Sequence, residues 1–235
     1  MKRLHIGAWI VGCLCLTSGA ISGEFRIVAL KGDVTVRRSV QEGWVIVAVG
    51  DVLKPDDSIR SGENSSATLT TDGQNEFLLP ESAIIDLADL RKLTREEVML
   101  KLAMERVRSV PSRDRKNDLK LPRTTAVHGA DQKTRPMPGT SGDNTGALEL
   151  NGARVLYGLG CYGTSALKAK SVFRIHPTLR KEIESRILVA IALEKIQLAG
   201  EALNEYTELV REGLSPEYLA HIEEKISQLR KNSGD

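Results

Sequence analysis

The chain has 235 residues, a formal net charge of +2, and 41% hydrophobic but only 4% aromatic residues. This length suffices for one domain or two small ones, and the apolar fraction suffices for a folded core. A nearly neutral chain lacks the basic surplus of a general binder of nucleic acids or membrane surfaces, and no nucleic-acid partner is predicted.

The N-terminus has the pattern of a secretory signal peptide. Two basic residues precede an apolar run over 4–16, and small and polar residues follow. The run is shorter than the ~20 residues of a membrane-spanning helix. We expect residues 1–20 to be removed after Ala20, which places the protein outside the cytoplasm, in the periplasm or cell envelope. Two alternatives stay open, an uncleaved anchor and lipidation at Cys13, whose preceding residues resemble a bacterial lipobox. Only these would attach the protein to a membrane.

Cysteine usage excludes an internal disulfide once the signal peptide is removed. Of the three cysteines, Cys13 and Cys15 lie in that segment, which leaves Cys161 alone. The fold must therefore rest on its apolar core. Cys161 is expected to be a buried small residue, because a nucleophilic thiol needs an activating partner that the sequence does not identify.

From Phe25 to about Leu87 the sequence alternates short apolar runs with turn residues. Phe25, Ile27 and Ala29 share one face of the first run. Short strands joined by Gly, Pro, Asn and Asp turns predict a small all-β module, either a sandwich or barrel-like.

Glycines and aspartates are expected to serve these turns. The glycines predicted to supply backbone conformations that other residues resist are Gly50, Gly62 and Gly73. The aspartates predicted to close turns through nearby backbone groups are Asp51, Asp57 and Asp72. The alternative use of these carboxylates is calcium binding, which needs ~6–8 converging oxygens that nothing in the sequence brings together.

In this order and spacing, the turn and core positions resemble the FecR domain. The matching positions are Gly32-x-Val34-x-Val36, Trp44, Gly50-Asp51-x-Leu53, Asp57-x-Ile59, Ser65-x-Ala67-x-Leu69 and the hairpin signal Asp72-Gly73. The resemblance implies an extracytoplasmic β-rich module. In the founding type, this module follows a transmembrane helix and a cytoplasmic anti-sigma segment and relays a signal from an outer-membrane receptor. Only three residues precede the apolar run here, so we expect the module without that regulatory segment.

The segment 94–108 permits two interpretations. Thr94 and Glu97 have the spacing of a helix capping box, whereas the apolar residues that follow alternate as in a strand. The FecR resemblance favours the strand, since such domains end with a basic strand and a Thr-Pro-x-Ala-Val-x-Gly element, matched in part just before Gly129. We therefore predict a FecR-like β domain over 24–129, with a short helix near Thr94 as the alternative.

Residues 106–123 are strongly basic, and residues 130–146 are poor in core-forming side chains. The first segment contains seven Arg or Lys residues and two acidic ones. It is either a solvated loop or a site for an anionic cell-wall polymer, and no aromatic residue is interleaved for base stacking. The second segment predicts a flexible linker and the clearest domain boundary in the chain.

After the linker the apolar period becomes helical. The predicted helices cover 147–157, 166–175, 183–194, 199–210 and 216–230, and the last begins at Ser215-Pro216. Residues 147–231 therefore predict an α-helical bundle, and the fold class is α+β with two domains.

Two of the helix pairs resemble tetratricopeptide repeats. The matching positions are Ala153, Gly160, Tyr162 and Pro177 in the first copy and Ala190, Ala202 and Tyr206 in the second, with Gln197 where glycine is usual. The resemblance implies a groove, lined by the first helix of each pair, that binds a protein or peptide. The candidate partner-binding residues that it implies are Arg154, Tyr157, Glu184, Glu194 and Lys195. A compact helical domain that only supports the β module is the alternative.

No motif in the sequence carries catalytic or cofactor chemistry. The chain contains no HExxH, CxxC or phosphate-binding glycine loop, and His128, His176 and His221 are isolated in sequence. We predict no catalytic residue, metal or cofactor. The expected function is that of an exported, non-enzymatic envelope protein that binds an envelope protein or peptide, in scaffolding or envelope signalling. The alternative is a cell-wall polymer or glycan binder that uses residues 106–123.

Overall fold

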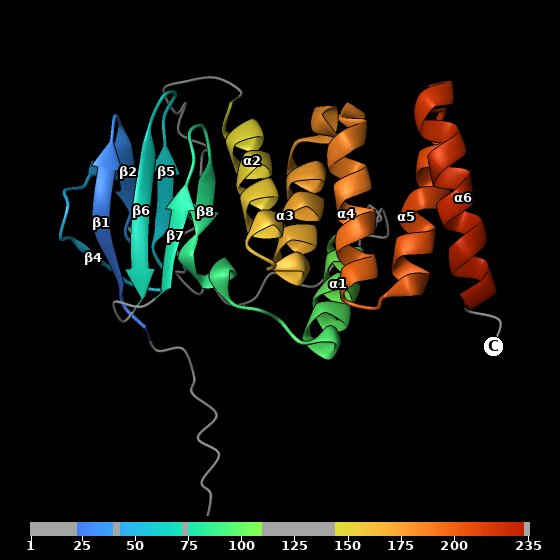
Figure 1. Ribbon diagram of the computed structural model, residues 1–235, viewed down its shortest axis with the longest axis horizontal. Coiled ribbons are helices and arrows are strands. Elements are labelled where there is room, and N and C mark those ends of the chain that lie inside the picture. The colour runs from blue at the N-terminus through green and yellow to red at the C-terminus, as the bar shows by residue number, and fades with distance from the viewer. Residues whose placement is uncertain (1–22, 40–42, 72–74, 110–143, 233–235) are drawn as a thin grey trace, which may run out of the picture.

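The computed structural model describes residues 23–39, 43–71, 75–109 and 144–232, and it has a two-part α+β layout (Figure 1). A β module forms one end of the molecule, and helices α2 to α6 stand in a row that extends away from it. This arrangement confirms the predicted class, with strands first and helices after them. Within these ranges, no helix combines the length and apolar character needed to cross a membrane.

The β module consists of two four-stranded antiparallel sheets, with strand orders β4-β1-β6-β7 and β3-β2-β5-β8. The strands are β1 (Phe25–Lys31), β2 (Val34–Arg37), β3 (Trp44–Ile46), β4 (Val52–Leu53), β5 (Ser58–Ser61), β6 (Ser66–Thr71), β7 (Asn75–Leu79) and β8 (Ile84–Asp86). Strands β6 and β7 are antiparallel neighbours, as a hairpin requires, although its tip at Asp72-Gly73 lies outside the described residues.

One apolar core joins the two sheets. Ile27 and Leu69 from the first sheet and Ile59 from the second are fully buried in it. This follows from strand geometry, because successive side chains point to opposite faces of a sheet. The prediction that Ala29 shares the face of Ile27 is wrong, since a bulge between these two residues shifts the register and leaves Ala29 exposed.

The turns of the β module use aspartates largely as predicted. Asp57 is buried and accepts hydrogen bonds from three donors, the nearest being the N–H of Lys54 at 2.9 Å. Asp51 also accepts a hydrogen bond from a nearby backbone N–H. Gly50 has a φ of +97°, but Gly62 does not adopt a positive φ, which corrects its predicted role.

Residues 95–109 form helix α1 (Arg95–Ser109), so the interpretation that favoured a strand is wrong. The capping box starts this helix. The N–H of Glu97 donates to Thr94 Oγ1 at 3.2 Å, and the N–H of Thr94 donates to Glu97 Oε2 at 2.8 Å. Val98 and Leu102 are buried in the helical core and not in the β core. Helix α1 thus belongs to the helical half, and the predicted domain boundary at Gly129 lies outside the described residues.

The remaining α-helices correspond to the five that the sequence predicts, although α3 begins at Tyr162, four residues before its predicted start. They are α2 (Thr145–Gly158), α3 (Tyr162–Ile175), α4 (Ile183–Lys195), α5 (Ala199–Glu212) and α6 (Pro216–Asn232). Each of them packs against the next along the row. The small residues Ala153, Ala190 and Ala202 are fully buried where helices approach one another.

The α2–α3 and α4–α5 turns have the same hydrogen-bond pattern. The N–H of Gly160 donates to the carbonyl of Tyr157 at 3.0 Å, and the N–H of Gln197 donates to that of Glu194 at 2.9 Å. Both residues are in the left-handed region, with φ of +76° and +61°. Gln197 therefore adopts the same left-handed conformation as Gly160, so the two helix pairs repeat one local structure despite different residues.

The β module and the first helix pair share buried surface. Leu156 on α2 and the neighbouring Cys161 belong to the β-module core. Asn151 on α2 donates from Nδ2 to the carbonyl of Ser82 at 2.8 Å. Cys161 is buried, as predicted, and burial raises the pKa of its thiol. A raised pKa keeps the thiol protonated and argues for a packing role.

Candidate functional site

The predicted partner-binding residues lie on α2 and α4, the first helices of the two pairs. Arg154 on α2 reaches the start of α4, where its Nη2 lies 2.8 Å from Glu182 Oε2 and 2.6 Å from Ser185 Oγ. Its side chain is still 40% exposed. Arg154 therefore links two first helices and keeps part of its guanidinium in solvent.

Helix α4 is linked in turn to α6. Tyr218 on α6 donates to Glu184 on α4 at 3.3 Å, and Lys225 Nζ on α6 lies 3.2 Å from Glu194 Oε2. Together with the Arg154 contacts, these bonds tie α2, α4 and α6 to one another. We call the surface formed by these three helices the first-helix face.

Glu194 is half-buried, and two neighbouring helices contact its carboxylate. It also accepts a hydrogen bond from the hydroxyl of buried Tyr206 on α5, at 2.5 Å. Burial and this bond to Glu194 raise the pKa of Tyr206 far above its ordinary value. Both carboxylate oxygens of Glu194 thus serve contacts within the protein, and Glu194 has a structural role.

Tyr157 and Lys195 differ in the exposure of their side chains. The Tyr157 ring packs edge-on against Tyr162, with ring centroids 5.1 Å apart, and it is partly buried against the helical core. Lys195 is exposed at the end of α4. The structure therefore leaves Arg154, Glu184 and Lys195 with solvent-exposed charge, while Tyr157 and Glu194 mainly pack helices.

Arg186 is a charged residue of α4 that the sequence analysis missed. Its side chain is only 3% exposed and forms an ion pair with Glu212 of α5, and Glu208 lies 3.9 Å away. The sequence did contain a signal for this ion pair. Arg186 is the only basic residue in the mainly apolar stretch 183–193, and a basic residue that is buried in such a stretch normally has an acidic partner.

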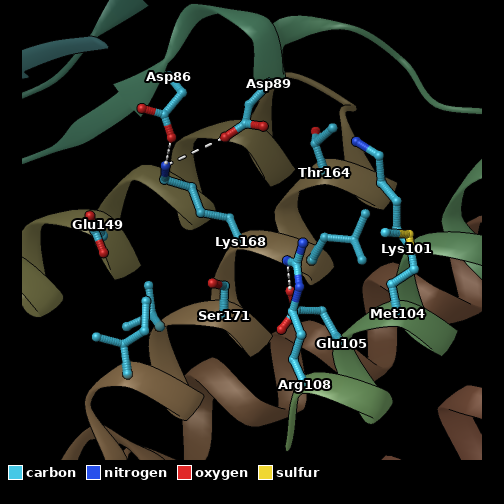
Figure 2. A pocket seen from close by; sticks show the side chains of 13 residues that line it. Asp86, Asp89, Lys101, Met104, Glu105, Arg108, Glu149, Thr164, Lys168 and Ser171 are labelled. Carbon is cyan, nitrogen blue, oxygen red and sulfur yellow. Dashed lines mark hydrogen bonds and ion pairs between the residues drawn. The ribbon is translucent and has the colours of Figure 1, made fainter. Parts of the chain in front are cut away.

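A second candidate region, which we call the junction pocket, has a volume of about 430 Å³ and lies where the β module meets α1, α2 and α3 (Figure 2). Its ionisable lining residues are Asp86, Asp89, Lys101, Glu105, Arg108, Glu149 and Lys168. Its larger apolar lining residues are Met104, Leu167, Val172 and Ile175. This combination could not be read from the sequence, because its members come from β8, the 3-10 helix Leu87–Leu90 and helices α1, α2 and α3.

Lys168 on α3 organises the β-module side of this pocket. Its Nζ lies 2.7 Å from Asp86 Oδ2 and 3.4 Å from Asp89 Oδ2, and its side chain is 8% exposed. Burial lowers the pKa of Lys168, but the two carboxylates outweigh burial and leave it above its ordinary value. Lys168 is therefore protonated at neutral pH, which suits an ion pair and not a nucleophile or base.

The two aspartates respond differently to this one ammonium group. Burial acts to raise the pKa of Asp86, but Lys168 and a 2.5 Å hydrogen bond from Ser58 outweigh it, so the pKa is lowered. Burial raises the pKa of Asp89, and Lys168 offsets this only in part. Asp86 is thus the stronger partner of Lys168.

A polar row crosses the outer face of the second sheet and ends at this ion pair. Trp44, Arg37, Ser58 and Asp86 are direct cross-strand neighbours on β3, β2, β5 and β8. Arg37 stacks over the Trp44 ring and donates to Ser58 Oγ at 3.2 Å. Ser58 donates to Asp86, and the row connects the far edge of the sheet to α3 through Lys168.

Comparison with known proteins adds no assignment. No family model, no curated protein and no solved structure matches the chain. Interpretation of the first-helix face and of the pocket therefore rests on their own geometry.

Two further predictions concern metals and the basic segment. No group of three or more His, Cys, Asp or Glu residues that could hold a metal ion occurs in 23–39, 43–71, 75–109 or 144–232. Of the basic side chains in 106–123, the structure describes Arg106 and Arg108, which form ion pairs with Glu201 and Glu105. The other basic residues of that segment, and His128, lie outside the described residues.

Proposed function

We propose that this protein is an exported, non-enzymatic component of the bacterial envelope that binds a protein or peptide partner at its first-helix face. The FecR-like β module and the tetratricopeptide-like helices are the proposed identities of its two halves. In this proposal the β module is a rigid support that positions the helices, in a scaffolding or signalling assembly.

The observation that carries this proposal is the set of bonds that join α2, α4 and α6. Arg154 links α2 to α4, and Tyr218 and Lys225 link α6 to α4. Such bonds hold three helices in fixed positions before a partner arrives, and a pre-organised surface loses less entropy on binding.

The exposed charges of this face suggest the chemistry of the partner. Arg154 and Lys195 are basic, whereas Glu184 is acidic. A polar segment with charges of both signs would complement them, since charge complementarity sets specificity and association rate.

The two proposed family resemblances have local support. The repeated left-handed residue at Gly160 and Gln197 and the buried Ala153 and Ala190 are what a pair of tetratricopeptide-like repeats needs. For the FecR-like module, the support is the sequence pattern together with antiparallel strands whose turns use Gly50 and Asp57.

Affinity capture tests this function. The tagged protein is incubated with envelope extract of the cells that make it, and retained proteins are identified by mass spectrometry. The double variant Glu184→Lys/Lys195→Glu preserves net charge and is expected to lose the partner at least tenfold. The matched control Lys31→Glu/Glu76→Lys, on exposed positions of β1 and β7 in the β module, also preserves net charge and is expected to retain it. Equal retention by both variants, or no retained partner with the wild-type protein, contradicts the proposal.

A further inference from the structure

Two arginines and a tryptophan form a cluster on the outer face of the second sheet. The guanidinium carbon of Arg37 lies 5.2 Å from the centre of the Trp44 ring, and that of Arg60 lies 4.9 Å from it. Trp44 stands on β3, the edge strand of this sheet, and Arg37 is its direct cross-strand neighbour on β2. We call these three side chains the Arg–Trp cluster. All three residues are partly exposed, and α2 packs against β8, at the opposite edge of the sheet, so solvent reaches the cluster.

The positive charges of the cluster have no acidic partner in the part of the chain that the structure describes. Neither Arg37 nor Arg60 forms an ion pair there. The adjacent Arg38, by contrast, pairs with Asp57 at 3.1 Å. Arg37 donates a hydrogen bond to Ser58, whose hydroxyl is neutral. Two guanidiniums beside one ring repel each other, and the negative face of the ring offsets this repulsion only in part.

The acidic residue that shares a row with the cluster is already used elsewhere. Asp86 follows Ser58 across the sheet, on β8. Its carboxylate accepts a hydrogen bond from Ser58 and pairs with Lys168 at 2.7 Å. Asp86 forms no ion pair with Arg37, so the charge of the cluster is left for a group from outside the described chain.

A buried hydroxyl adds a further unsatisfied donor to the same face. Thr35 is the cross-strand neighbour of Arg60 and lies two residues before Arg37, so its side chain shares their face of the sheet. The residue is 7% exposed, and its Oγ1 has no hydrogen-bond partner in the described part of the chain. Buried polar groups normally have such a partner. This face therefore presents donor groups in excess of acceptors.

We propose that the Arg–Trp cluster binds a phosphate group of a ligand. Guanidiniums present paired N–H donors that fit the oxygens of phosphate or carboxylate. A doubly charged phosphate suits two adjacent guanidiniums better than a singly charged carboxylate does. The Trp44 ring holds both arginine side chains through cation–π contacts, so binding orders them at little cost in entropy. The site belongs to the β module and shares no residue with the first-helix face.

Tryptophan fluorescence tests the proposal directly. The chain has two tryptophans, and Trp9 lies in the predicted signal peptide, so a protein of residues 21–235 emits from Trp44 alone. Inorganic phosphate is titrated at about pH 8, where it is mainly a dianion, and at constant ionic strength, so that general screening does not change. A saturable change in the emission of Trp44 is expected. No saturable change up to ~50 mM phosphate overturns the proposal.

Variants assign the response to the two guanidiniums. Arg60→Gln is expected to weaken phosphate binding about fivefold or more, and Arg37→Gln is a second variant with the same expectation. Lys31→Gln, which removes the same charge from an exposed position of β1, is the matched control and should bind like the wild type. Circular dichroism checks that each variant is folded. Unchanged binding in both arginine variants, or equal weakening in Lys31→Gln, overturns the proposal.

A vesicle titration separates two sources of the phosphate group. A response of Trp44 to vesicles of phosphatidylglycerol at lower phosphate concentration than to inorganic phosphate assigns the site to a lipid headgroup. A response to inorganic phosphate and glycerol phosphate, without one to the vesicles, assigns it to a soluble phosphate ester. Either result supports the proposal, provided that Arg60→Gln weakens it.

The variant Glu42→Gln tests the acidic residue that precedes Trp44 most closely in the sequence. Glu42 lies outside the described residues. Phosphate binding is expected to be at least as strong in Glu42→Gln as in the wild type. Binding that appears only in Glu42→Gln overturns the proposal, because the Glu42 carboxylate is then the natural partner of the two guanidiniums.

Discussion

Gly152 on α2 lies directly against the carbonyl oxygen of Ile84 on β8. A Cβ atom at position 152 would stand 1.8 Å from that oxygen, far inside van der Waals contact. The β module and the helices therefore approach at a distance that only glycine allows at this position.

Gly152→Ala is expected to weaken the packing between the two halves. The clash involves backbone and cannot be relieved by a side-chain rotation, so a loss of at least ~2 kcal/mol in the free energy of unfolding is expected. Urea denaturation and limited proteolysis measure the effect. Gly158→Ala on the same helix is the control, because an added Cβ meets nothing within 4 Å there and stability should not fall. Equal stability of Gly152→Ala and wild type would contradict this account of the interface.

Gln197→Gly is expected to stabilise the protein. Gln197 has a φ of +61°, in the region that costs a residue with a side chain roughly 1 kcal/mol or more relative to glycine. The free energy of unfolding should rise by ~0.5–1 kcal/mol, as measured by thermal or chemical denaturation. Gly160→Ala, at the equivalent turn, should lower it by a similar amount. A destabilised Gln197→Gly would mean that the glutamine side chain makes a contribution the turn geometry does not explain.

Removing the charge of Asp86 and removing the charge of Asp89, both in the junction pocket, are expected to change the stability of the protein in opposite directions. Asp86 has a lowered pKa, so its ion pair with Lys168 stabilises the fold above the ordinary aspartate pKa near 4, and the contribution is lost as pH falls through the folded-state pKa. Asp86→Asn is therefore expected to destabilise the protein at pH 7 and to have a much smaller effect near pH 3.

Asp89→Asn is the matched comparison. The pKa of Asp89 is raised, so its charged form is disfavoured in the folded state at neutral pH, and removing the charge should be neutral or stabilising. Urea denaturation of both variants at pH 7 and pH 3 checks the pair. A larger loss for Asp89→Asn than for Asp86→Asn at pH 7 would reverse our assignment of the principal Lys168 partner.

The signal-peptide prediction is tested by the mass of the mature protein. Cleavage after Ala20 should give a chain that starts at Ile21 and is recovered from the periplasm or cell envelope. A lipid-modified Cys13 or an intact N-terminus would instead place the protein on a membrane.

Much of this fold was readable from the sequence because local rules determine it. Apolar spacing predicts the helices Ile183–Lys195 and Ala199–Glu212. The capping residues predict the start of α6 at Pro216. Helix α1 was misjudged because its apolar residues from Val98 to Met104 alternate along the sequence as in a strand, and because the FecR resemblance favoured a strand there.

The junction pocket was not predictable from sequence. Asp86 and Lys168 are far apart in the chain, and they become partners only because α2 packs against β8 and α3 packs against α2. Likewise, the predicted groove residue Glu194 could be assigned a structural role only once the positions of Tyr206 and Lys225 were known.

Site-specific photo-cross-linking in living cells tests partner binding at the first-helix face most directly. A photoreactive amino acid replaces Lys195 on that face and, as the control, Val49, which is exposed on the β module. We predict one discrete heterologous adduct from position 195 and none of the same mass from position 49. No adduct at position 195, or the same adduct from both positions, would contradict the account.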